Sequence, residues 1–418
     1  MSQRKELSPQ PPILRQPPTH LPDYVVLNIL SRLPVKSVLR FRCVHKSWNS
    51  SITNSNFIST HLSNNSNNNE NDSDDDRAYL IHMPAMYSPS SNPVCMVACD
   101  RKFNRISEYP IPSELHLNCP EIVGSCNGLV CLAQYGNGST IAEVIYVWNP
   151  SIRKFKRLPD TCLSQYDSVA TGFAYQCENN DYKVVKISSL RAPNRPEDEV
   201  EAEVYTLSLN SWRRVGISLR PNVVVSNIKY YSSATFVNKA LHWLGYISEG
   251  DGQFLNQNMI LSFDVNNDKF GEIALPRGQV LPQGLVAVPQ SLMVFKGKLA
   301  FITFGYPVIY HGYMLTHTPC FIWVMGEYGV HESWNKLFSV QFENVIRVHF
   351  YGCTKHGELL VEKELKTESD DGELQRCNDS VIVSFDPETL HEKDLGIQHL
   401  PLIATSFMES LVLLDGAT

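Results

Sequence analysis

Histidine and glutamate stand side by side at two places in the chain, where they could begin a zinc motif or an acid–base pair. The pairs are His331-Glu332 and His391-Glu392, and neither is followed by the second histidine that a helical zinc-protease motif needs. The chain also contains no glycine-rich phosphate loop, no dinucleotide fingerprint and no nucleophile elbow. These patterns predict no catalytic residue and no bound cofactor.

The eleven cysteines are the other residues that could carry chemistry. Cys95 and Cys99 form one closely spaced pair and Cys126 and Cys131 another, but neither pair is matched by further ligands downstream, as a zinc site requires. The number of cysteines is odd and their positions are scattered. We therefore expect no metal site, and thiols that stay reduced within a core.

The composition bounds the kind of protein. The 418 residues have a net charge of −7, a hydrophobic fraction of 43% and 47 glycine and proline residues together. Nucleic-acid binding needs a basic face, so the acidic balance argues against that partner. The longest uncharged stretch, residues 299–325, contains glycines and prolines and is interpreted as buried strands rather than a membrane helix. We expect a turn-rich globular chain that binds no membrane.

The N-terminal residues 1–19 are polar and rich in proline, and we expect them to be disordered. They lack the apolar core of a signal peptide, so the expected location is the cytoplasm, the nucleus or both.

Residues 20–62 form the most helical zone. Apolar residues recur at three- and four-residue spacing, while Pro22 suits a helix start and Pro34 a helix end. This zone holds five basic residues and one acid. Such a short piece barely makes a core of its own. It is therefore either a helical cap on the following domain or a docking element for an acidic partner.

The string from Leu21-Pro22-Asp23 through Ile29-Leu30-Ser31-Arg32-Leu33-Pro34 to Ser47-Trp48 resembles the F-box. This resemblance implies a three-helix element that binds the Skp-family adaptor of an SCF-type cullin-RING ubiquitin ligase. Two positions depart from the commonest plant pattern, which has glutamate in place of Asn28 and cysteine in place of His45. By the same resemblance, the adaptor-binding residues are Leu21, Pro22, Ile29, Leu30, Leu33, Pro34, Val35, Leu39, Val44 and Trp48.

Residues 63–77 contain no apolar side chain and consist largely of asparagine, aspartate and serine. We expect a disordered spacer that separates the helical zone from the rest of the chain. An acidic recognition tail, or a phosphorylation site at Ser73, is the alternative interpretation.

Residues 78–418 have the pattern of an all-β domain with an internal repeat. A polar residue precedes an aromatic residue by six positions in three copies: Asn149 and Phe155, Thr206 and Trp212, Asp264 and Phe270. This spacing predicts two antiparallel outer strands joined by a turn. Tight glycine or polar turns between apolar runs predict the inner strands.

The repeat predicts a β-propeller of about six blades, with seven as an alternative. The first blade would cover residues 78–112, and a strand at 406–413 would complete it and close the ring. A β-sandwich is the competing architecture. The expected fold class is therefore α+β multidomain: a small N-terminal three-helix element followed by an all-β propeller.

The phrases Gly124–Leu132, Trp148-Asn149-Pro150, Gly172–Tyr175 and Glu409-Ser410-Leu411 resemble the plant F-box-associated domain. The plant family with this domain includes regulators of defence signalling and self-incompatibility proteins. The resemblance implies that this domain recruits a protein substrate, without naming it. The long loops expected to be available for that contact are residues 189–201, 248–258, 305–318 and 366–378.

Together these patterns predict a non-catalytic substrate receptor of a ubiquitin ligase. Two alternatives remain at this stage. One is a propeller hydrolase, whose carboxylates would meet in a central pocket, although Asp181 and Asp264 stand in contexts typical of turns. The other is a propeller scaffold or carbohydrate-binding module without ligase function.

Overall fold

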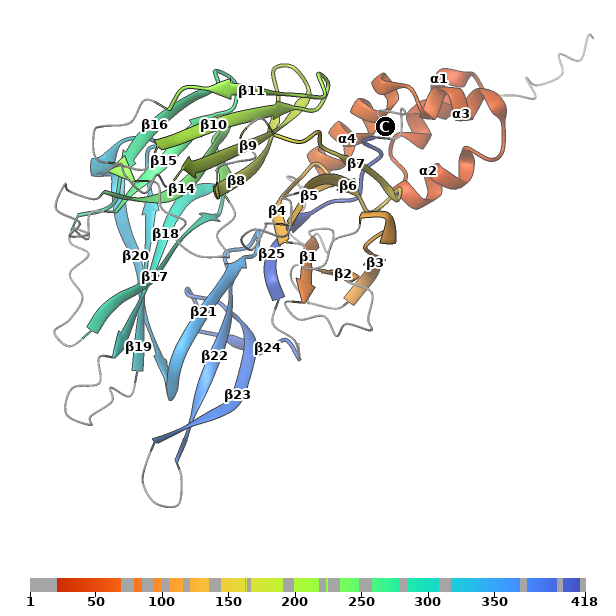
Figure 1. Cartoon of the computed structure of the whole chain (residues 1–418). Coiled ribbons are helices and arrows are strands. Elements are labelled where there is room, and N and C mark those ends of the chain that lie inside the picture. Colours follow the sequence, from red (N-terminus) through yellow and green to blue (C-terminus); the bar gives the residue numbers. More distant parts are fainter. Residues whose placement is uncertain are drawn as a thin grey trace, which may run out of the picture.

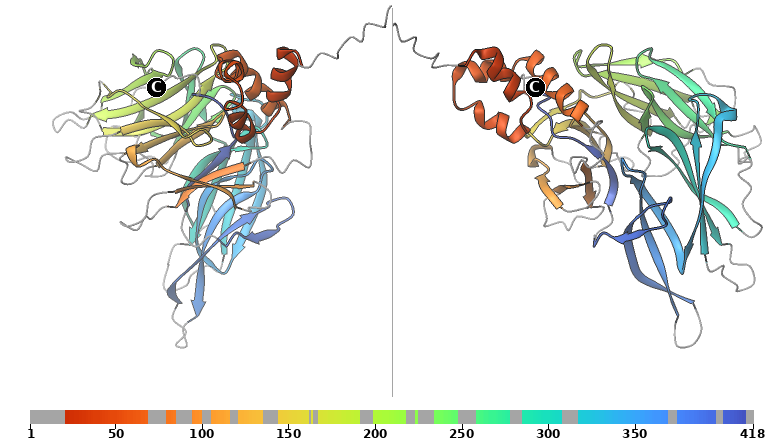
Figure 2. Two further views of the ribbon diagram at one scale, coloured as in Figure 1. Left: turned by 90° about the vertical axis from the view of Figure 1, so that its right-hand side faces the viewer. Right: turned by 180° about the vertical axis from the view of Figure 1, so that it is seen from behind.

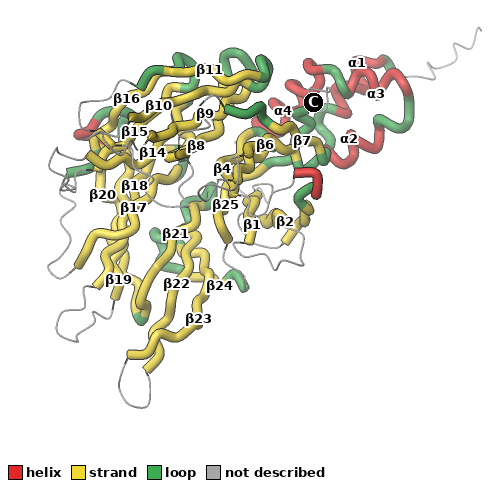
Figure 3. Tube along the Cα trace, in the orientation of Figure 1, coloured by secondary structure: helices red, strands yellow, loops and turns green. Residues whose placement is uncertain are grey.

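Helices occupy one end of the molecule and strands the remainder in the computed structural model (Figures 1 and 3). None of the described helices is both long and apolar enough to cross a membrane. The structure describes residues 21–68, 79–84, 94–99, 105–115, 121–134, 144–161, 163, 167–190, 199–217, 223–224, 234–247, 258–277, 285–307, 317–368, 374–396 and 401–413. The predicted leader, residues 1–19, lies outside this described part.

Four helices, rather than the predicted three, form the N-terminal part. They are α1 (Asp23–Leu30), α2 (Val35–Phe41), α3 (Lys46–Ile52) and α4 (Ser55–Asn68). Pro22 directly precedes α1, as expected. Pro34, expected to end the first helix, directly precedes α2, while α1 already ends at Leu30. Proline fits both positions because the first turn of a helix has no partner for its backbone N–H groups. The fourth helix begins where the Asn54 side chain accepts a hydrogen bond from the Asn56 backbone at 2.9 Å.

The predicted spacer begins later in the structure than Ser63, because α4 continues to Asn68. The Asn64 amide donates to the Ser31 hydroxyl at 2.9 Å, and the fully buried His61 is 2.9 Å from the Leu33 carbonyl oxygen. These bonds join α4 to the turn after α1, which offsets the weak helix propensity of asparagine. Residues 69–77 of the predicted spacer lie outside the described part.

In the described part of the chain, twenty-five strands form six sheets, which are the blades of a propeller. Blade one contains β25 (Pro401–Phe407), β1 (Tyr79–Pro84), β2 (Val94–Cys99) and β3 (Arg105–Pro110), in that order across the sheet. Blade two is β4 (Glu121–Cys126), β5 (Leu129–Gln134), β6 (Val144–Asn149) and β7 (Lys154–Arg157). Blade three is β8 (Asp167–Gln176), β9 (Asp181–Leu190), β10 (Glu199–Thr206) and β11 (Ser211–Val215).

The other three blades are built in the same way. Blade four is β12 (Val223–Val224), β13 (Thr235–Val237), β14 (Ala240–Ile247), β15 (Asn258–Asp264) and β16 (Lys269–Ala274). Blade five is β17 (Leu285–Phe295), β18 (Lys298–Pro307), β19 (His317–Met325) and β20 (Trp334–Glu343). Blade six is β21 (Val345–Cys353), β22 (Leu359–Glu368), β23 (Leu374–Phe385) and β24 (Glu392–Asp394). Short 3-10 helices occupy Ser113–Leu115 and His331–Ser333.

The predicted repeat matches the register of the outer strands. The aromatic residue of each copy lies opposite the residue before the polar one: Phe155 faces Trp148, Trp212 faces Tyr205 and Phe270 faces Phe263. The last two pairs have ring centroids 5.4 and 4.8 Å apart. Such cross-strand aromatic pairs stabilise antiparallel sheets.

Apolar clusters between neighbouring blades hold the ring together. Blade two packs against blades one and three, blade four against blades three and five, and blade five against blade six. Strands β21 and β25 make the sixth junction. This cyclic order confirms the six-bladed propeller and rules out a β-sandwich.

The ring is closed by the C-terminal part of the chain, as predicted, but the strand lies earlier than expected. Strand β25 covers Pro401–Phe407 and pairs with β1, placing Phe407 opposite Tyr79. Residues 408–413 form no strand. Their side chains and carbonyls are used elsewhere, as described below.

Strands extend into the predicted loops. For example, β9 continues to Leu190 and β18 to Pro307, while β23 begins at Leu374. These long antiparallel extensions satisfy backbone groups that a loop would leave to water. Residues 191–198, 248–257, 308–316 and 369–373 of the predicted loops lie outside the described part.

The helices pack directly against the propeller beside blade two (Figure 2). Leu411, from the segment after β25, is 1% exposed and shares a cluster with Val38 and Ile52. The Asn180 amide of blade three also donates to the Ser59 hydroxyl of α4 at 3.3 Å. The expectation that a spacer separates two cores is therefore wrong, because a segment distant in sequence joins them.

Candidate functional site

Exposed apolar side chains concentrate on the N-terminal helices. Among the described residues, nine large hydrophobic side chains are exposed, and four of them lie between positions 21 and 44. We call these four the apolar set: Leu21, Tyr24, Ile29 and Val44, with exposures of 63%, 76%, 49% and 64%. Because exposed apolar groups are costly in water, such a concentration is typical of a protein-binding surface.

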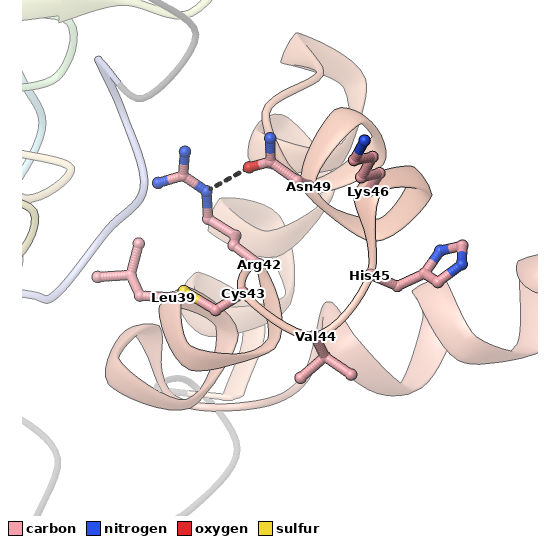
Figure 4. Close-up of a pocket in the computed structure, with 7 residues that line it drawn as sticks. All are labelled: Leu39, Arg42, Cys43, Val44, His45, Lys46 and Asn49. Atoms are coloured by element: carbon pink, nitrogen blue, oxygen red, sulfur yellow. Dashed lines mark hydrogen bonds between the residues drawn. The ribbon is translucent and has the colours of Figure 1, made fainter.

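A surface hollow of about 450 Å3 lies at the turn between α2 and α3, lined by residues including Leu39, Cys43 and Val44 (Figure 4). Arg42 Nε donates to the Asn49 side-chain oxygen at 3.0 Å and ties the end of α2 to α3. That bond holds the turn in one shape, so Val44 is presented outward from a fixed loop.

The two positions that depart from the commonest plant pattern have local structural roles. His45 precedes α3, and its Nδ1 accepts a hydrogen bond from the Ser47 backbone at 3.3 Å, which satisfies a free donor of the first helical turn. The Asn28 side-chain oxygen accepts a bond from Arg32 Nε at 3.3 Å. Both departures are compatible with the helical arrangement.

Exposed basic residues lie on the same helical part of the chain as the apolar set, with Lys36 and Arg40 on α2 and Lys46 on α3. Within the part of the chain that the structure describes, Lys36, Arg40 and Lys46 are exposed and form no ion pair with a carboxylate. A surface of exposed apolar groups with cations around it is complementary to an acidic partner that carries its own apolar groups.

The structure separates the ten predicted adaptor-binding residues into three groups. The exposed ones are Leu21, Pro22, Ile29, Pro34 and Val44. Leu33, Leu39 and Trp48 are half-buried, and Leu30 and Val35 are buried within the helical core. The exposed group can touch a partner without rearrangement, whereas Leu30 and Val35 hold the helices together.

Tyr24 was missed by the sequence analysis, although its side chain is the most exposed of the apolar set. It lies in the first turn of α1, four residues before the exposed Asn28, so these two residues share one face of the helix. That face is distinct from the face carrying the buried Leu30. The helical spacing could have placed Tyr24 on the surface.

The residues that could carry chemistry have structural roles in the propeller. Burial raises the pKa of the Cys126 thiol to about 12 and raises that of Cys131 further, so neither thiol is a ready nucleophile or ligand. His331 Nε2 is 3.1 Å from the Leu275 carbonyl oxygen. Among the described residues, no three histidine, cysteine or acidic side chains gather as a metal site would need.

The two isolated acids considered earlier also have structural roles. The Asp181 carboxylate accepts hydrogen bonds from the backbone of Tyr182 at 2.7 Å and of Ser208 at 3.2 Å. Asp264 accepts bonds from the backbone of Asn266 and Asn267 in the turn between β15 and β16. Burial opposes ionisation of Asp264, but hydrogen bonds from Asn267 and Asn266 lower its pKa overall. Asp264 therefore makes a local turn, whereas Asp181 joins the start of β9 to the turn between β10 and β11.

Comparison with protein families decides what this arrangement is. The F-box domain profile matches residues 19–60, and the profile of the F-box associated beta propeller domain matches residues 73–406. The chain belongs to the F-box associated beta propeller family. The N-terminal helices are its F-box, and the apolar set lies on that F-box.

Several Arabidopsis thaliana proteins are similar to this F-box protein over most of their length. F-box protein At3g07870 is 26% identical, with 91% of this chain and 88% of the relative covered. F-box/kelch-repeat protein At3g23880 is 27% identical over 77% and 80% of the two chains. F-box protein CPR1 is 26% identical over 91% and 85%. Each of these alignments covers at least 77% of this chain, and each relative is named as an F-box protein.

Proposed function

We propose that this F-box protein is a substrate-recognition subunit of an SCF-type ubiquitin ligase. In this proposal the F-box binds a Skp-family adaptor and the propeller holds a protein target. The observation behind this proposal is the apolar set, which lies exposed on the F-box. The exposed Lys36, Arg40 and Lys46 of the same helical part form no ion pair among the described residues. The family membership and the plant relatives support the general role.

The receptor accelerates ubiquitin transfer by proximity in this proposal. Binding adaptor and target at once places the target at a high effective concentration near the charged conjugating enzyme. No residue of this chain needs to react. The structural roles of Asp181, Asp264 and the buried cysteines agree with a receptor that carries no chemistry of its own.

Adaptor binding is the direct test, and the structure selects the variants. Leu33 and Trp48 are poor choices, because both pack within the F-box core and their loss would also disturb folding. Val44→Asp and Ile29→Asp instead place a charge on exposed apolar positions. Leu390→Asp is the control, because Leu390 is 63% exposed, as Val44 is 64% exposed, but lies in blade six.

We expect the full-length protein to retain a purified Skp-family adaptor in a pull-down. Val44→Asp should weaken that binding by about tenfold or more, as charge insertion into an apolar contact does, and Leu390→Asp should bind like the parent protein. Failure of the parent chain to bind any Skp-family adaptor would overturn the proposal. Unchanged binding by both F-box variants would show that the apolar set is not the contact surface.

A further inference from the structure

The segment after β25, residues 408–413, leaves the propeller ring and runs between blade two and the F-box (Figure 1). We infer that this segment, here called the clamp, fixes the F-box on the propeller and so sets the orientation of the adaptor-binding surface relative to the target-binding domain. The functional consequence rests on the proposed function, but the structural connection does not.

Asn149 at the end of β6 anchors the clamp. Its side chain is fully buried, and its amide nitrogen lies 3.0 Å from the Ser410 carbonyl, 3.2 Å from the Ser410 hydroxyl and 2.9 Å from the Val412 carbonyl. Its side-chain oxygen accepts a bond from the Ser151 backbone at 2.9 Å. One buried amide therefore satisfies the turn of blade two and the backbone of the clamp together.

The turn between β4 and β5 allows the clamp to approach. Gly128 has a φ of +80°, and a Cβ at that position would lie 2.6 Å from the Met408 carbonyl oxygen. Only glycine adopts this backbone conformation readily and, without a side chain, leaves room for the backbone of the clamp. The clamp therefore lies against two turns of blade two. In one turn the Asn149 amide binds its backbone, and in the other Gly128 leaves it space.

Alternate leucines of the clamp enter different cores. Leu411 is 1% exposed and belongs to the F-box cluster with Val38 and Ile52. Leu413 is 5% exposed and belongs to the cluster between blades two and three. One short segment thus contributes to both parts, and its backbone is held by blade two. Rigid attachment of the F-box follows, because the two cores share a continuous, hydrogen-bonded piece of chain.

Leu411→Ala in the full-length protein tests this inference, with Leu413→Ala as the matched control. The two positions carry the same residue, lie two apart and are similarly buried. Hydrogen exchange should accelerate by about tenfold or more in α2 and α3 for Leu411→Ala, since the cavity removes apolar contact from the F-box core. Exchange in β4–β6 should remain unchanged. Leu413→Ala should show the reverse, with faster exchange in the strands of blades two and three that line its cluster and unchanged exchange in α2 and α3.

Small-angle scattering distinguishes a loosened attachment from a merely softened core. Leu411→Ala should increase the radius of gyration and broaden the distance distribution, whereas Leu411→Met, which conserves volume, should restore the parent profile. An unchanged scattering profile for Leu411→Ala would overturn the inference, whether or not exchange in α2 and α3 accelerates, because the F-box would then stay fixed without Leu411. Neither readout needs the adaptor, so a chain that fails to bind adaptor would defeat the proposed function and leave this test intact.

Discussion

At the scale of single residues, the same turn position holds aspartate in some blades and asparagine in another, and the hydrogen bonds of each explain the difference. Asp264 and Asp386 occupy the outer turns of blades four and six, where their carboxylates accept backbone hydrogen bonds. Asn149 makes the same turn contact in blade two but must also donate to the clamp. A carboxylate cannot donate, so this position requires an amide.

Asn149→Asp should therefore destabilise the protein, by about 3 kcal/mol, because it removes the donors to Ser410 and Val412 and places a buried charge beside their carbonyls. The reciprocal change, Asp264→Asn, keeps an oxygen acceptor for the turn and should alter stability by about 1 kcal/mol or less. Chemical denaturation of both variants measures the difference. Equal losses would show that Asn149 acts only in its local turn.

A buried histidine makes stability depend on pH. Burial lowers the pKa of His242 to about 4. Its Nδ1 lies 3.0 Å from the Thr235 carbonyl and therefore carries the proton, and its Nε2 accepts from the Tyr328 hydroxyl at 2.7 Å. The folded protein thus holds this imidazole in its neutral form.

The stabilising contribution of neutral His242 should be complete above about pH 6.5, the ordinary pKa of histidine in an unfolded chain. It should decline as the pH falls toward 4, because the unfolded chain then binds a proton that the folded chain does not. The loss should approach about 2 to 3 kcal/mol. Urea unfolding of the parent and His242→Gln across this range measures it. Parallel pH profiles for the two proteins would contradict the expectation.

At the scale of elements, the hairpins were predictable in register, whereas the distant closing strand was predicted with the wrong bounds. The opposition of Tyr205 to Trp212 and of Phe263 to Phe270 follows from a short turn, so the local sequence contains the necessary information. Strand β25 instead pairs with β1, more than three hundred residues away. The predicted bounds were 406–413 because the clamp ends in the apolar run Leu411–Leu413, which is also strand-like in sequence.

The same distinction explains the helical elements. The end of α4 is held by Ser31, a partner outside the helix. The polar composition of residues 63–68 therefore predicted a spacer where the structure has the last turns of α4. Within the F-box, the motif identified the ten adaptor-binding candidates by resemblance. It could not separate the exposed Val44 from the buried Val35, because burial there is decided by a core to which Leu411 contributes.

At the scale of the whole molecule, two consecutive segments near the C-terminal end of the described chain have different roles: β25 closes the ring and the clamp attaches the F-box. Strand β25 supplies the innermost strand of blade one and contacts β4 and β21 on either side. Phe407 then packs between blades one and two, with its ring centroid 6.2 Å from that of Tyr109. Directly after Phe407 the chain becomes the clamp. Ring closure and attachment of the F-box are therefore separable in sequence.

Three truncated chains should separate ring closure from attachment of the F-box. A chain ending after Leu413 keeps β25 and the clamp and should melt like the full-length protein. A chain ending after Phe407 keeps the ring closed, so its propeller should still unfold cooperatively while the F-box loosens. A chain ending after Leu395 loses β25, which leaves β1 with an unpaired edge and blades one and six without their junction. We expect this last chain to lose its sharp calorimetric transition and to self-associate on size-exclusion chromatography. A sharp transition at the parent temperature would show that the ring holds together without β25.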